Sequence, residues 1–101
     1  MSDDIEQQFR ALANAFIDLA NQKCDEAPRE NVGMALLYAA SRFNAFVVAA
    51  HAADLRDYEG AREKAMEFFR GEYERMLGEN LDDYRQSFDE DFKYAHLMKR
   101  D

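Results

Sequence analysis

The chain has 101 residues and a net charge of −8, from 13 basic and 21 acidic side chains. This length corresponds to a single helical domain, residues 1–101, that can bury a core without a metal or a disulfide. The charge excludes a general phosphate-neutralising surface, which needs clustered Lys and Arg, so we expect no nucleic-acid partner. One Pro and four Gly leave long segments of good helix formers, which predict an all-α fold.

The first predicted helix runs from Asp3 or Asp4 to about Cys24, because apolar side chains recur there at intervals of three and four residues. The segment 25–30, DEAPRE, then breaks the pattern. Pro28 cannot donate a helix hydrogen bond and disfavours helix at the residue before it. A short loop is therefore expected to reverse the chain, so that the first two helices are antiparallel neighbours.

The second predicted helix, at about residues 31–54, is apolar in nearly every direction, a pattern typical of a helix surrounded by protein. We expect it to be the centre of a compact bundle of three or four helices, with neighbours on two faces. Arg42 and Asn44 lie near its middle, where charged groups are costly in lipid. The sequence therefore predicts no membrane span.

A polar turn is expected at residues 54–60, followed by a third helix with charged pairs such as Glu72 and Arg75 on its outer face. Two alternatives compete at Gly78. The helix ends there and a fourth begins with Asn80 as its cap, or one long helix continues through the glycine. The start signal after Gly78 slightly favours a break or bend, and the tail at residues 89–101 is expected to fray.

The polar residues of the second helix are the candidates for a buried polar or ligand-contacting site. Asn44 and His51 are seven residues apart and share a face, whereas Arg42 points elsewhere. They could line a small polar pocket, or they could simply hydrogen-bond to neighbouring helices. A buried Arg42 would require a carboxylate from another helix.

Tyr84, Phe88 and Phe92 are candidates for an interface, although aromatic side chains at helical spacing are also typical of a core. Known motifs for cofactors or metals are absent from the sequence. It has no Glu-x-x-His pair, no calcium loop and no glycine-rich phosphate loop, and one Cys with two His is too few for a zinc site within one chain. We therefore expect no catalytic residue, no cofactor and no metal.

The segments LLYAASRFNAFVVAA (36–50), AFIDLAN (15–21) and MLGENLDDY (76–84) resemble a small proteobacterial family of unknown function, with LYAASRFNAF as the most specific part. The likeness spans roughly residues 9–88. It implies a bacterial, compact helical protein and carries over no catalytic residue.

Two functions remain open from the sequence. The first is a non-enzymatic helical interaction module that forms a homo-oligomer or binds a protein partner, since so few helices have difficulty covering an all-apolar one. The alternative is a small-molecule-binding or enzymatic protein with a pocket near Arg42, Asn44 and His51. The lone Cys24 and the absence of a secretory signal after Met1 predict a cytoplasmic location.

Overall fold

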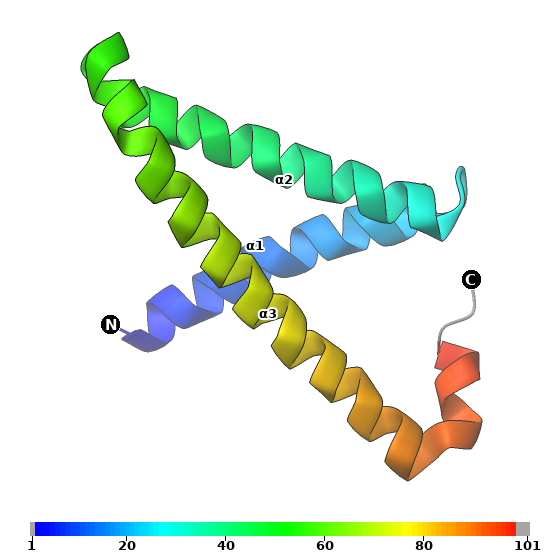
Figure 1. The fold of residues 1–101 in the computed structure, drawn as a ribbon. Coiled ribbons are helices and arrows are strands. Elements are labelled where there is room, and N and C mark those ends of the chain that lie inside the picture. Colours follow the sequence, from blue (N-terminus) through cyan, green and yellow to red (C-terminus); the bar gives the residue numbers. More distant parts are fainter. Residues whose placement is uncertain (1, 99–101) are drawn as a thin grey trace. The chain divides into compact units, whose positions relative to one another are not determined.

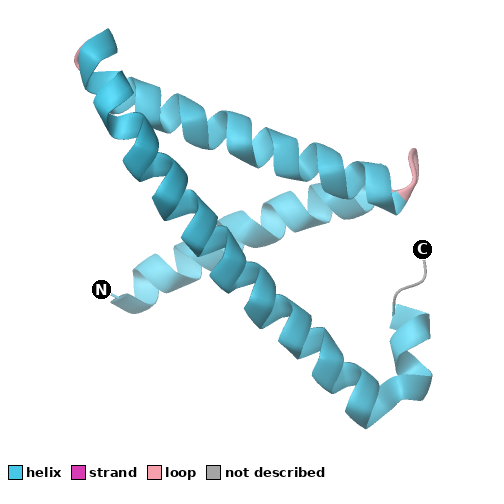
Figure 2. Cartoon of the chain, viewed as in Figure 1, coloured by secondary structure: helices cyan, strands magenta, loops and turns pink. Residues whose placement is uncertain are grey.

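The structure, a computed structural model, describes the backbone of residues 2–98 and the side chains of residues 3–88. Within this part the chain forms three helices and no strand: α1 (Ser2–Lys23), α2 (Arg29–His51) and α3 (Leu55–Met98) (Figure 1, Figure 2). The predicted all-α fold is confirmed. The chain divides into two compact units, Met1–Phe43 and Asn44–Arg100, so that α2 belongs partly to each.

Unit 1 is a helical hairpin in which α1 and the first part of α2 are joined by a turn at residues 24–28. The backbone N–H of Ala27 donates to the carbonyl of Lys23 at 3.1 Å, and this bond closes the end of α1. Pro28 comes directly before the first residue of α2 and its carbonyl accepts from Val32 N–H at 3.0 Å. A proline is favourable here because its fixed φ suits a helix start and the missing N–H costs nothing. The predicted chain reversal is confirmed.

Unit 2 contains the end of α2 and all of α3, joined by a turn at residues 52–54. The prediction of a polar turn over residues 54–60 was wrong, because α3 already begins at Leu55. Asp54 is the N-cap: its Oδ1 accepts from Asp57 N–H at 2.9 Å. The Asp57 carboxylate in turn accepts from Ala53 N–H at 2.9 Å. This reciprocal pair satisfies two backbone donors and closely resembles a capping box.

Replacing Asp54 with alanine is expected to lower the free energy of unfolding by about 1 kcal/mol, because the Asp57 N–H loses its acceptor. Urea denaturation followed by circular dichroism measures this loss. The variant Asp54→Ser is the matched control, since serine is also a good cap and should retain most of the stability. Equal stability of the alanine and aspartate proteins would contradict the assignment of Asp54 as the cap.

The helix does not break at Gly78, so the slight preference for a break or bend was wrong. α3 runs through Gly78 as one helix of 44 residues. The Asn80 side chain does not cap a new helix; its Nδ2 donates to the carbonyl of Met76 at 2.9 Å, within the same helix. The helix also continues through Met98, and the predicted fraying of residues 89–101 stays a prediction, since their side chains lie outside the described residues.

The expected burial of the central helix is the largest difference between the sequence predictions and the structure. None of the side chains described, including all those of α2, is buried. Each unit gives α2 a single helical neighbour, α1 in unit 1 and α3 in unit 2. One neighbour covers one side of a helix, so the apolar circumference of α2 stays largely open within each unit.

Candidate interaction surface

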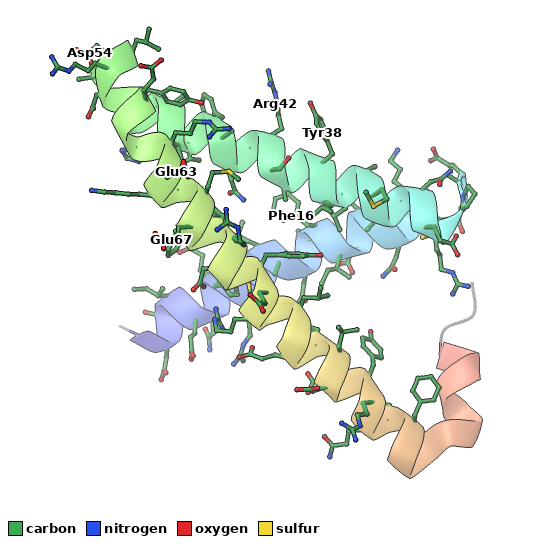
Figure 3. All side chains as sticks on the ribbon, in the orientation of Figure 1. Phe16, Tyr38, Arg42, Asp54, Glu63 and Glu67 are labelled. Atoms are coloured by element: carbon green, nitrogen blue, oxygen red, sulfur yellow. The ribbon has the colours of Figure 1, made fainter. Side chains whose placement is uncertain are left out.

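The polar candidates on α2 do not converge. Arg42 and His51 are exposed and Asn44 is half-buried. At 100° per residue, Asn44 and His51 lie within about 20° of each other, whereas Arg42 lies on the opposite side from His51. Figure 3 shows Arg42 and Tyr38 projecting from the same side of the α2 ribbon. Because Arg42 is exposed, the burial that would require a carboxylate partner is not present.

Two of the three aromatic interface candidates are accessible. The side chain of Tyr84 is 64% exposed and that of Phe88 is 39% exposed. The side chain of Phe92 lies outside the described residues. Tyr84 and Phe88 are part of a longer row of exposed apolar side chains, which we call the α3 stripe; it consists of Met66, Tyr73, Leu77, Leu81, Tyr84 and Phe88.

The α3 stripe follows an eleven-residue period: Met66, Leu77 and Phe88 are eleven residues apart, as are Tyr73 and Tyr84. Eleven residues correspond to nearly whole turns of an α-helix, so such a row stays on one side of a straight helix. At 100° per residue all six members fall within about 80° of the circumference. The full row could have been found from this period, although the sequence prediction named only its aromatic C-terminal part.

The stripe and the contact between α2 and α3 occupy different sides of α3. The half-buried residues of unit 2 are concentrated in the last turns of α2 and the first half of α3; they are Asn44, Val47, Val48, Ala52, Tyr58, Ala61, Ala65, Phe69 and Glu72, with Gly78 and Ser87 further along α3. On the helical wheel Tyr58, Ala61 and Ala65 lie about 100° or more from the centre of the α3 stripe. The α2–α3 hairpin therefore leaves the stripe accessible.

Charged side chains occupy much of the remaining surface of α3, beside the exposed apolar side chains of Leu55, Phe68 and Met76. Arg75 lies between two carboxylates, 2.8 Å from Glu72 Oε1 and 3.3 Å from Glu79 Oε2. The predicted Glu72–Arg75 pair is thus confirmed. The hydrogen bond and charge of Glu72 raise the pKa of Arg75 further above its ordinary value. All three side chains are well exposed, so these pairs contribute little to stability.

A shallow depression lies at the start of α3 and is not a continuation of the stripe. Its lining residues are Asp54, Arg56, Asp57, Gly60, Ala61 and Lys64. Asp54 marks this end of the helix in Figure 3. Arg42, Asn44 and His51 are not among the lining residues, and both aspartates already hydrogen-bond to backbone N–H groups.

The described residues contain no group of three or more His, Cys, Asp or Glu side chains that could hold a metal ion. Cys24 is a half-buried free thiol in the turn after α1. By length and composition alone, α2 is long and apolar enough to cross a membrane, a criterion that core helices of water-soluble proteins also meet.

Comparison with known proteins identifies one family. Residues 9–85 match the family described as "Protein of unknown function (DUF3144)". No curated protein and no solved structure matches the chain.

Proposed function

The chain belongs to the DUF3144 family, whose description assigns no activity, and from this starting point we propose that it is a non-enzymatic helical module that self-associates. The observation that carries this proposal is the exposure of its apolar side chains. In the described part of the chain, 21 large hydrophobic residues are exposed by 39–69%. Fully burying one such side chain contributes about 1.5–3 kcal/mol, so partial exposure across a set of this size favours association.

The exposed residues are distributed over both units. In unit 1 they include Phe9, Phe16 and Phe43, and in unit 2 Leu81 and Tyr84. Neither a two-helix hairpin nor a long helix with one short neighbour can enclose such residues, because each helix then has only one covered side. A second copy of the chain supplies the missing helices without requiring any further protein.

We place this module in the bacterial cytoplasm and outside the membrane. The single thiol of Cys24 suits a reducing compartment. Arg42 and Asn44 near the middle of α2 disfavour insertion, since a charge at the centre of a bilayer costs several kcal/mol. The net charge of −8 also disfavours binding to anionic headgroups.

Sedimentation velocity at micromolar concentration tests the proposal, and we expect a dimer or larger oligomer. A monomer over the whole concentration range would contradict it. Flotation with phosphatidylcholine–phosphatidylglycerol vesicles separates self-association from membrane insertion, because the chain is expected to remain in the unbound fraction. Co-flotation that resists high salt would instead support insertion of α2, since salt weakens only electrostatic adsorption.

A further inference from the structure

We propose that two copies of the chain pair through α3, with the helices antiparallel and Leu77 of each copy at the two-fold axis. This inference rests on the proposed self-association and names its surface and orientation. The surface that packs against the α3 stripe is therefore the same stripe on a second copy of the chain.

The length of α3 is the first argument. At about 1.5 Å per residue, residues 55–88 of α3, which hold the stripe, extend about 50 Å, whereas the 23 residues of α2 extend about 35 Å. α2 is connected to the start of α3 by a three-residue turn, and α1 folds back along α2 within unit 1. Because α2 ends at this turn, its 23 residues are too few to reach much beyond Gly78 along α3. The part of the stripe from Gly78 to Phe88, about 15 Å long, lies beyond the reach of α2.

The symmetry of the α3 stripe is the second argument. Met66 and Phe88 are each eleven residues from Leu77, and Tyr73 and Leu81 are each four residues from it. An antiparallel two-fold axis at Leu77 sets Met66 of one copy against Phe88 of the other, and Tyr73 against Leu81. Such an interface is self-complementary, as a closed two-fold dimer requires.

The same axis also pairs a cation with an aromatic ring. Arg70 and Tyr84 are each seven residues from Leu77, so Arg70 of one copy meets Tyr84 of the other. Arg70 lies within the same sector of the helical wheel as the stripe. A guanidinium over a tyrosine ring is favourable, and it gives the one charged residue of this sector between Met66 and Phe88 an aromatic partner.

Charge selects the antiparallel orientation. Five of the seven basic residues of α3 lie in its first half, residues 55–76; they are Arg56, Arg62, Lys64, Arg70 and Arg75. The second half, residues 77–98, has six acidic residues and two basic ones. The first half also has six acidic residues, so its net charge is −1, against −4 for the second half. A parallel pair would bring the two −4 halves together, whereas an antiparallel pair sets each against a −1 half and so reduces the repulsion.

The area available is sufficient for a specific dimer. Side chains of this size present roughly 150–250 Å². The six members of the stripe are exposed by 39–64%. Complete coverage of the stripe would therefore bury at most about 500–700 Å² per chain and about 1,000–1,400 Å² in the pair, which reaches the lower end of the range of specific interfaces.

Cross-linking between two single-cysteine proteins tests the pairing. Met66→Cys and Phe88→Cys are made separately in a Cys24→Ala background, and each is treated with a short bifunctional maleimide alone and after mixing. We expect a covalent dimer mainly in the mixture. Tyr73→Cys and Leu81→Cys form a second pair with the same expectation, for use if the first pair weakens the dimer.

The matched control pair is Phe68→Cys with Gln86→Cys. These residues are also equidistant from Leu77 but lie opposite the stripe, so their mixture should cross-link at least tenfold less. Cross-linking of each variant with itself but not with its counterpart would overturn the antiparallel orientation. A sedimenting dimer in which neither stripe pair cross-links would overturn the inference and leave self-association standing, whereas a monomeric wild-type chain would overturn both.

Discussion

Replacing Leu81 with aspartate is expected to raise the dissociation constant of the dimer by about 100-fold or more. Each dimer contains two copies of Leu81, each 60% exposed in the single chain, and losing the burial of these exposed parts removes about 2–4 kcal/mol. At about 1.4 kcal/mol per tenfold change, this corresponds to roughly 30- to 700-fold. The added carboxylate also has to be desolvated, which increases the effect. Sedimentation equilibrium over a concentration series measures the dissociation constant.

The matched control for this experiment is Gln86→Asp. It adds the same charge to the same part of α3 but lies on the side opposite the stripe. The control should change the dissociation constant by less than about threefold, because an exposed charge is screened by solvent and salt. Equal weakening by both variants would contradict a stripe-specific interface and would indicate that the net charge of α3 controls association.

Substitutions at Gly78 are expected to change stability in opposite directions. Gly78→Pro should lower the free energy of unfolding by about 3 kcal/mol or more, since proline removes a hydrogen bond and clashes with the preceding turn. Gly78→Ala should raise it by about 0.5–1 kcal/mol. A Cβ at this position would meet no described atom within 4 Å, and the backbone does not have a positive φ. Urea denaturation at fixed protein concentration measures both changes.

The sign of the Gly78→Ala effect separates one continuous helix from two. If the helix ended at Gly78 with the glycine in a left-handed conformation, alanine would be strained and would destabilise the protein. Destabilisation by alanine would therefore contradict the continuous α3. Gly78→Pro should also weaken the dimer, because a kink at Gly78 separates Met66 from the Phe88 of the second copy.

Local signals predicted the parts of the fold that depend on neighbouring residues. Pro28 ended the first helical pattern and the structure has its turn there, since the missing N–H and the fixed φ act within one turn of helix. The signal for the start of α3 also lies in neighbouring residues, namely the reciprocal hydrogen bonds of Asp54 and Asp57. The sequence prediction did not recognise this signal. Gly78 carried conflicting local signals, and the unbroken apolar spacing across it agrees with the continuous helix.

The candidate sites were predicted less well, for a physical reason. Periodicity identifies which side of a helix is apolar, but it does not state what covers that side. α2 was therefore expected to be buried, although it has one neighbour in each unit. Arg42 was expected to point away from Asn44 and His51, as the helix geometry has it, but the sequence did not show that none of the three is buried.

The sequence by itself determined the helical class, the chain reversal at Pro28 and the apolar sides of each helix, because these follow from backbone chemistry and from spacing along a few turns. Only the tertiary structure decided that α3 is a single 44-residue helix, and therefore that it is about twice the length of either neighbour. Whether a side chain is buried depends on how far the neighbouring helices extend beside it. That distance follows from the lengths of all the helices together and cannot be read from one short stretch of sequence.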